Sequence, residues 1–239
     1  SSLFGQETIK TTSIYRDYHR AWELYEKSQF TAARIEFENF INQPIDRNDP
    51  LIVKAYYYRG MAALALYNDD AIHLLSSFNQ AYPENPFRNQ INFEIGNYFF
   101  QKEDFLGALP WYEEVQDDLL SPEEEEPFHF KKGYSYYQEG QESKALESFK
   151  HVKNSTGQYG TISLYYYAHL NYKLGNLTES KSDFHRLKHI YEFTTIAPYY
   201  IVQINHKLGL YDSVIAYAPS VLDTADLGNY NDIIHLLGD

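Results

Sequence analysis

The chain has 239 residues and carries 33 acidic against 20 basic side chains, which gives a formal net charge of −13 at pH 7. Proteins that neutralise nucleic-acid phosphates usually show the opposite balance or a basic stripe, so we expect no nucleic-acid partner. Cysteine is absent, which excludes disulfide scaffolds, thiol catalysis and cysteine-ligated zinc. Apolar residues make up 44% of the sequence, enough for a continuous core without metal or disulfide.

The first 14 residues are polar and lack the apolar run of a signal peptide. We expect residues 1–14 to form a flexible N-terminal segment. Because the first residue is Ser1 rather than methionine, we expect the chain to lack its natural start, which leaves export open as a hypothesis. No stretch is apolar enough to predict a transmembrane helix, so membrane association is expected only through parts outside this chain or through a partner.

Small residues recur along the chain in two matched series, with 34 to 39 residues between successive members of the first series. Each member of the second series follows its partner by 11 or 12 residues. Where two helices cross closely, a small side chain lets the backbones approach, so the pattern predicts repeated antiparallel helix pairs. The first series is Ala21, Gly60, Gly96, Gly133, Ala168 and Val202, and the second is Ala33, Ala71, Ala108, Ala145, Ser180 and Val214.

Six repeats follow from this period and occupy residues 15–228. In chain order they are expected at about 15–45, 52–86, 88–121, 125–156, 161–193 and 196–225. Residues 229–239 contain NDIIHLL and are predicted to be the first helix of a truncated seventh repeat, so we expect a fragment of a longer protein.

Turn signals fall inside the repeats at a fixed place. Gly140, Gly175 and Gly209 each stand seven residues after a small residue of the first series, where glycine suits a left-handed helix C-cap. The densest charge run, Glu123 to Glu126, lies between two prolines and is expected to form a solvated loop between repeats.

Two stretches carry a resemblance to a known family: IGNYFFQKEDFLGALPWYEEV from Ile95 and KGYSYYQEGQESKALESFKHV from Lys132. Both resemble the tetratricopeptide repeat, and the likeness covers nearly the whole chain. Asn92 and His129 stand where the family has an early tryptophan, so the match rests on the glycine, alanine and aromatic pattern. The resemblance implies an all-α fold, a right-handed α-superhelix (solenoid) of antiparallel helix pairs.

The tyrosine-rich, asparagine-rich repeats, with phrases such as YYYRG and YYQEG, are similar to large exported tetratricopeptide proteins of Gram-negative bacteria. This likeness implies a periplasmic or cell-envelope location, and the cytoplasm is the alternative.

In this family the first helix of each repeat lines the concave side. The residues three before, one after and four after each small residue share that helix face. Rings there supply contact area, while amides and imidazoles can hydrogen-bond to a peptide backbone or a sugar. The alternative is that these rings pack against the neighbouring repeat and fill the superhelix interior. The candidate groove residues are Asn97, Phe100, Tyr134, Tyr137, Tyr165, His169, Tyr172, Tyr199, Gln203 and His206.

We therefore expect a non-catalytic scaffold that binds an extended peptide or a partner subunit through an aromatic-rich concave groove. The alternatives are a carbohydrate or cell-envelope glycan-binding module, an accessory domain of a larger enzyme, and a purely structural spacer. No nucleophile-elbow, P-loop or dinucleotide-binding motif occurs, so no catalytic residue and no cofactor is expected. His185 and His189 are four apart but lack a third ligand, so no metal site is expected either.

Overall fold

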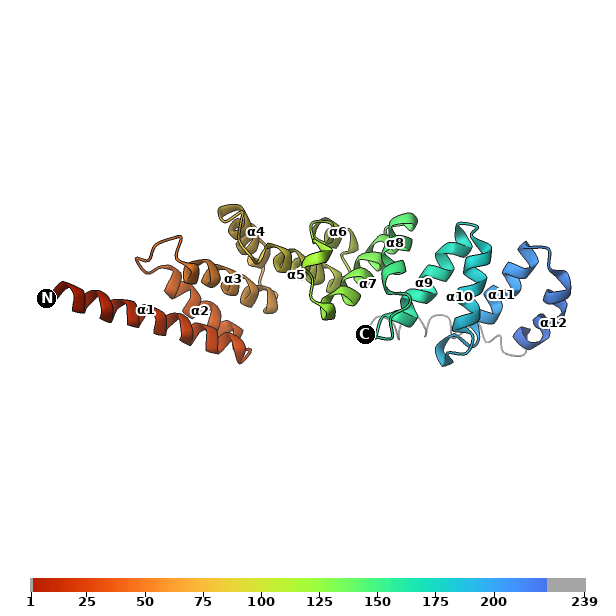
Figure 1. The fold of residues 1–239 in the computed structure, drawn as a ribbon, viewed down its shortest axis with the longest axis horizontal. Helices are drawn as coiled ribbons and strands as arrows, with labels where there is room; N and C mark the ends of the chain where they lie inside the picture. The colour runs from red at the N-terminus through yellow and green to blue at the C-terminus, as the bar shows by residue number, and fades with distance from the viewer. Residues whose placement is uncertain (1, 223–239) are drawn as a thin grey trace. The chain divides into compact units, whose positions relative to one another are not determined.

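The computed structural model describes the chain from Ser2 to Leu222, with side chains described from Ile14 to Ala216. This part of the chain is all-α and contains no strand, as predicted (Figure 1). The predicted seventh-repeat helix at 229–239 lies outside the described residues. The helices are α1 (Ser2–Glu26), α2 (Phe30–Ile41), α3 (Pro50–Ala65), α4 (Ala71–Ala81), α5 (Arg88–Gln101), α6 (Phe105–Glu113), α7 (Pro122–Gln138), α8 (Glu142–Val152), α9 (Gly160–Lys173), α10 (Leu177–Leu187), α11 (Ile196–Lys207) and α12 (Tyr211–Leu222), with short 3₁₀ turns η1 (Asp117–Leu119) and η2 (Tyr191–Phe193).

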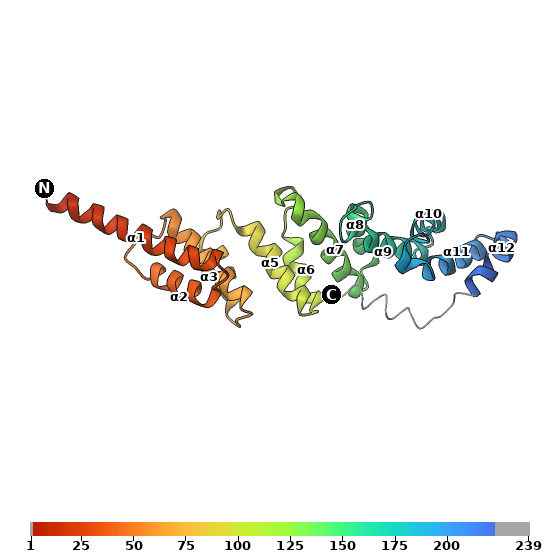
Figure 2. The ribbon, with the colours of Figure 1, turned by 90° about the horizontal axis from the view of Figure 1, so that it is seen from below.

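The helices group into two compact units, each of which we describe by itself. The first unit holds the chain up to Glu103 together with Pro110–Leu119, and the second holds Asp104–Leu109 together with the chain from Leu120. Within each unit consecutive helices pack against one another, from α1 to α5 in the first unit and from α7 to α12 in the second (Figures 1 and 2). The right-handed superhelical path predicted from the sequence would include both units. Because each unit is described by itself, this path stays a prediction.

Two stretches differ from what composition predicted. Residues 1–14 were expected to be a flexible segment, but from Ser2 onward they form the first part of helix α1. The run Glu123–Glu126 is the first turn of α7 and not an inter-repeat loop. There Ser121 and Glu124 form a capping box, in which the Ser121 N–H donates to the Glu124 carboxylate at 2.9 Å. Acidic side chains at a helix N-terminus are stabilised by the helix dipole, so this charge run favours the helix that it begins.

The small residues lie where helices cross, as the period predicted. A Cβ atom on Gly60, Gly96 or Gly133 would lie 2.4, 2.6 or 3.0 Å from a side-chain atom of the opposite helix. Such separations leave no room for a larger side chain without moving the helices apart. The last pair is looser, because Val202 and Val214 are only half-buried.

A left-handed residue ends the first helix of every repeat, seven residues after the small residue. The repeated backbone conformation closes a Schellman motif, for example with the N–H of Asn176 donating to the carbonyl of Asn171 at 2.8 Å. Glycine supplies this conformation in the second half of the chain, whereas the first three repeats use residues with a Cβ atom. The six residues and their φ angles are Ser28 (55°), Tyr67 (54°), Glu103 (58°), Gly140 (69°), Gly175 (83°) and Gly209 (72°).

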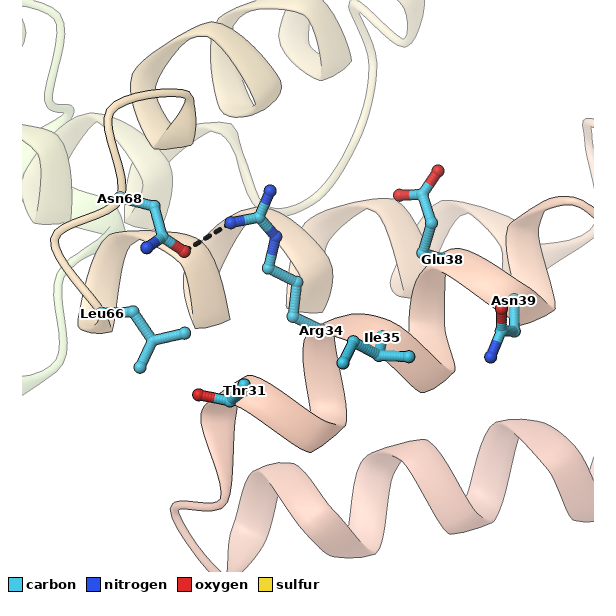
Figure 3. Close-up of a pocket in the computed structure, with 7 residues that line it drawn as sticks. All are labelled: Thr31, Arg34, Ile35, Glu38, Asn39, Leu66 and Asn68. Atoms are coloured by element: carbon cyan, nitrogen blue, oxygen red, sulfur yellow. Dashed lines mark hydrogen bonds between the residues drawn. The ribbon is translucent and has the colours of Figure 1, made fainter.

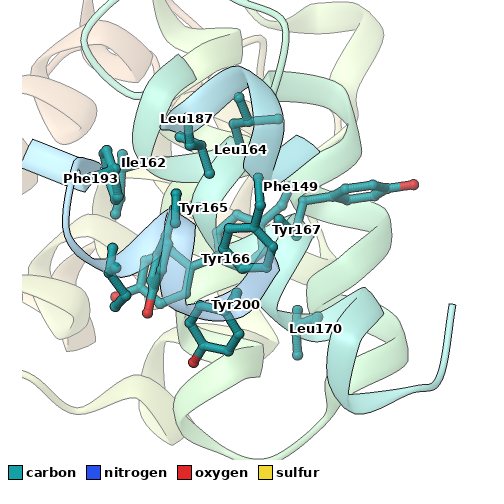
Figure 4. Packing of buried hydrophobic residues seen from close by; sticks show 14 of the residues in the cluster. Phe149, Ile162, Leu164, Tyr165, Tyr166, Tyr167, Leu170, Leu187, Phe193 and Tyr200 are labelled. Atoms are coloured by element: carbon teal, nitrogen blue, oxygen red, sulfur yellow. The ribbon is translucent and has the colours of Figure 1, made fainter. Parts of the chain in front are cut away.

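Neighbouring repeats are joined by stacked rings. A tyrosine two residues before the small residue stacks on a phenylalanine from the second helix of the preceding repeat (Figure 4, where Phe149, Tyr166 and Tyr200 are labelled). Offset-stacked rings contribute attraction beyond the area that they bury. The pairs, with centroid distances and interplanar angles, are Phe37–Tyr58 (5.7 Å, 15°), Phe149–Tyr166 (5.1 Å, 13°) and Phe184–Tyr200 (4.5 Å, 6°).

The left-handed positions predict opposite effects for two substitutions. Ser28→Gly should raise the free energy of unfolding by roughly 0.5–1 kcal/mol, because glycine adopts φ above zero without steric cost. Gly175→Ala should lower it by about 1 kcal/mol, and since nothing lies within 4 Å of the added Cβ atom the loss would come from the backbone alone. Urea unfolding of both variants checks this prediction. Changes of the same sign in the two free energies of unfolding would contradict it.

Candidate functional site

The structure places the predicted groove residues in both units, so they do not form one described site. Asn97 and Phe100 lie on α5 in the first unit. The other eight lie on α7, α9 and α11 in the second unit. Asn97 is only 8% exposed, which makes it part of the interior of the first unit.

Tyr134 and Tyr137 are half-buried on α7 and contact the next repeat. Both rings meet Tyr166 of α9, at centroid distances of 5.5 and 4.9 Å. Tyr134 also packs edge-on against Phe105, 5.4 Å away. These contacts match the alternative hypothesis, in which the rings fill the space between repeats.

His169 is the half-buried centre of the second-unit cluster. Its Nδ1 atom lies 2.9 Å from the Tyr200 hydroxyl, so the two share a hydrogen bond. Burial lowers the pKa of His169 below its usual 6.5, the nearby charge of Lys173 lowers it further, and Glu142 acts in the opposite direction. The imidazole is therefore predominantly neutral at pH 7.

The other predicted residues of this cluster, Tyr172, Gln203 and His206, carry polar groups on α9 and α11. The Tyr172 ring meets Tyr200 edge-on at 5.2 Å, and the ammonium of Lys207 lies 4.0 Å from the Tyr172 ring centre. Gln203 is half-buried, yet its side-chain amide makes no hydrogen bond with any residue that the structure describes. His206 is exposed and has a ring contact with Tyr211 at 5.8 Å.

Tyr165 and Tyr199 share one predicted helix position but differ in environment. Tyr165 is 5% exposed, because its ring stacks on Phe193 of η2 at 5.3 Å, and it therefore belongs to the core. Tyr199 is 44% exposed and touches the edge of Tyr200 at 5.7 Å. Of the two, Tyr199 alone presents its ring to solvent.

Sequence reasoning missed the position two residues before each small residue. Its tyrosines are the joining rings described above, and the repetition of tyrosine at that offset was the signal available for finding them. The third repeat carries Glu94 there, and the fourth carries Lys131. Glu94 accepts hydrogen bonds from the side-chain amides of Gln90 at 3.0 Å and Asn97 at 3.3 Å.

The first unit also contains two open cavities. One has a volume of about 510 Å³ and lies between α2 and the α3–α4 turn, where Arg34 donates to Asn68 and, at 2.5 Å, to Asp70 (Figure 3). The other, of about 470 Å³, is lined mainly by apolar side chains that include Pro50, Pro83 and Phe87. Because Arg34 is already paired, the first cavity presents no open positive charge.

Among the side chains that the structure describes, from Ile14 to Ala216, no group of three or more histidine, aspartate or glutamate residues is placed to hold a metal ion. In the same part of the chain, none of the helices combines the length and apolar character needed to span a membrane.

Comparisons with known proteins identify the fold. No family model matches the sequence, and no curated protein matches it significantly. A tetratricopeptide repeat protein from Parabacteroides merdae ATCC 43184 is similar in structure over 90% of this chain and 81% of its own, with a TM-score of 0.56 and 15% identity. The C-terminal part of a tetratricopeptide repeat-containing protein from Cytophaga hutchinsonii is similar over 98% and 92%, with a TM-score of 0.57 and 17% identity.

A third similar structure is MamA of AMB-1, which matches 75% of this chain and 92% of its own, with a TM-score of 0.58 and 16% identity. The chain thus has the tetratricopeptide repeat fold, as the repeated motifs predicted.

The environment of His169 predicts a pH dependence. Because its pKa is lowered in the folded chain, the unfolded chain binds the proton more readily, so the free energy of unfolding should fall as the pH drops below about 6.5. His169→Gln removes this contribution, so stability should fall less between pH 7 and pH 5 in the variant than in the wild type. Urea unfolding across this pH range checks the slope, and an unchanged slope would argue against a buried neutral imidazole.

Proposed function

We propose that this chain is a non-catalytic scaffold that binds an extended segment of a partner protein on α9 and α11 of the second unit. The surface is formed by His169, Tyr172, Gln203 and His206, which we call the α9–α11 strip. The observation that carries the proposal is the side-chain amide of the half-buried residue Gln203, which has no hydrogen-bond partner among the described residues. The amide atoms of Gln203 are not among the buried unpaired polar atoms of the described residues, so this donor and acceptor are open to solvent beside ordered rings and can serve a ligand.

The strip is held in place before a ligand arrives. Tyr200 stacks on Phe184 at 4.5 Å, shares a hydrogen bond with His169 and meets the Tyr172 ring at 5.2 Å. The Lys207 ammonium over the Tyr172 ring adds a cation–π contact. A surface whose rings are already ordered loses little side-chain entropy on binding.

The chemistry of the strip suits a polypeptide backbone. An extended segment offers alternating N–H and C=O groups, and the Gln203 amide supplies both a donor and an acceptor. Tyr172 adds an apolar ring with a hydroxyl at its tip, a combination enriched at protein interfaces. Analogy with the tetratricopeptide repeat fold gives further support to a role in protein interaction, although fold alone does not fix function.

Two substitutions test the strip. Tyr172→Ala and Gln203→Ala should each weaken binding of the partner by at least about 1 kcal/mol, the scale at which interface residues count as significant. The partner is obtained by affinity capture with the full-length protein and identified by mass spectrometry, and its Kd is then measured by calorimetry. The matched control is Tyr191→Ala, because this tyrosine is 89% exposed on η2 and lies outside the strip.

The control should leave Kd unchanged, and Gln203→Ala and Tyr191→Ala should keep the unfolding midpoint near that of the wild type. Tyr172→Ala should lower the midpoint, because its ring packs on Tyr200 and Lys207, so its Kd is measured at a temperature where the variant is folded. Unchanged Kd values for Tyr172→Ala and Gln203→Ala would refute the strip. Exposed rings and an amide also suit a sugar, so a parallel glycan array is included, and binding of a glycan in place of a protein would favour the carbohydrate alternative.

A further inference from the structure

The apolar cavity of the first unit is lined by three stretches of the chain. They are Asn48 in the turn before α3, the start of α3, and the segment 81–87 that joins α4 to α5. Three of the lining residues are prolines, Pro50, Pro83 and Pro86, whose rings give apolar surface without losing rotamer freedom when a ligand binds. The volume of about 470 Å³ lies within the range of about 300–1,000 Å³ that is usual for ligand pockets.

Contacts within the first unit hold the walls of this cavity in place. The Phe87 ring stacks on the Tyr57 ring of α3, with a centroid distance of 4.1 Å and an interplanar angle of 10°. The Tyr82 hydroxyl donates to the carbonyl of Arg47 at 2.9 Å. Asn85 fixes the joining segment, because its Nδ2 donates to the Tyr82 carbonyl at 2.7 Å and its Oδ1 accepts from the Phe87 N–H at 3.0 Å. A cavity that is already shaped loses little entropy on binding.

Two charges of opposite sign also line the cavity. Lys54 lies on α3, and Glu84 lies in the segment between α4 and α5. Both residues are exposed, and neither side chain makes an ion pair or a hydrogen bond with another described residue. An unpaired ammonium attracts a carboxylate, and an unpaired carboxylate attracts a cationic side chain. The apolar walls are therefore accompanied by one open charge of each sign, contributed by different walls.

We propose that this cavity binds an extended segment of a partner protein through one large apolar side chain, with an acidic residue of the segment against Lys54 and a basic residue against Glu84. The inference rests on the proposed scaffold function but uses residues outside the α9–α11 strip. Burial of the apolar side chain supplies the affinity. Charge complementarity sets the direction in which the segment lies, because exchanging its two charges would place like charges together.

A pair of defined peptides tests the cavity on the full chain. Each is a C-amidated, fluorescein-labelled nonapeptide of glycine with phenylalanine at its centre, aspartate two residues to one side and lysine two residues to the other. The second peptide has the two charges exchanged. Fluorescence anisotropy gives Kd, and the preferred charge order should bind at least about 10-fold more tightly than the same peptide with glycine in place of phenylalanine. No measurable binding of either peptide would overturn the inference.

Filling the cavity should block binding. Ala81 lines the cavity at the exposed last residue of α4, so the indole of Ala81→Trp should occupy it and weaken peptide binding by about 10-fold or more. The matched control is Ala65→Trp, which adds the same side chain at the exposed last residue of α3, outside the lining. It should change Kd less than about twofold. Equal losses in the two variants, or no loss in Ala81→Trp, would overturn the inference.

The charges are tested separately and cover the case in which Ala81→Trp fails to fold. At low salt the two charge orders should differ in Kd by at least about twofold in the wild type, the scale of exposed ion pairs. The double variant Lys54→Glu with Glu84→Lys should prefer the opposite order. Equal Kd values for the two orders in the wild type, or an unchanged preference in the double variant, would overturn the inference.

The cavity and the α9–α11 strip can fail independently. Tyr172→Ala should leave peptide binding within about twofold of wild type, because it lies in the second unit. Peptide binding that Ala81→Trp blocks, together with unchanged partner Kd values in Tyr172→Ala and Gln203→Ala, would refute only the strip. Partner binding that depends on Tyr172, together with peptide binding that Ala81→Trp leaves intact, would refute only the cavity.

Discussion

The stack of a tyrosine on the phenylalanine of the preceding repeat is the contact on which the other features depend. Tyr200 shows why: its ring lies parallel to Phe184 at 4.5 Å, its hydroxyl shares a hydrogen bond with His169, and its edge meets Tyr172. One side chain thus joins α9, α10 and α11 and also sets the positions of the surface rings. Packing between repeats and the shape of the strip follow from the same contact.

The same position gives a different result when its residue is charged. A ring at this place closes the junction between two repeats, whereas Glu94 keeps its carboxylate half-buried and held by two amides. A carboxylate makes no aromatic stacking contact, so its contribution is electrostatic. This position is occupied by tyrosine in α3, α9 and α11, by glutamate in α5 and by lysine in α7.

Much of the fold could be predicted from the spacing of small residues, because close helix crossings tolerate only small side chains. The spacing does not predict which individual rings are buried. Tyr165 and Tyr199 occupy the same helix position, but Phe193 in a short 3₁₀ turn covers Tyr165, and no repeat pattern specifies such a turn. The residue type of Ser28 does not indicate its left-handed backbone conformation, because glycine is the residue that usually predicts this conformation.

A double-mutant cycle on Phe184 and Tyr200 measures whether this stacked pair joins the repeats. Unfolding free energies of Phe184→Leu, Tyr200→Leu and the double variant, measured in urea, give the coupling between the two rings. We expect a coupling of roughly 0.5–1.5 kcal/mol, the range measured for aromatic pairs in contact. Additive losses, with a coupling near zero, would show that these rings merely fill space and that the joining contact lies elsewhere.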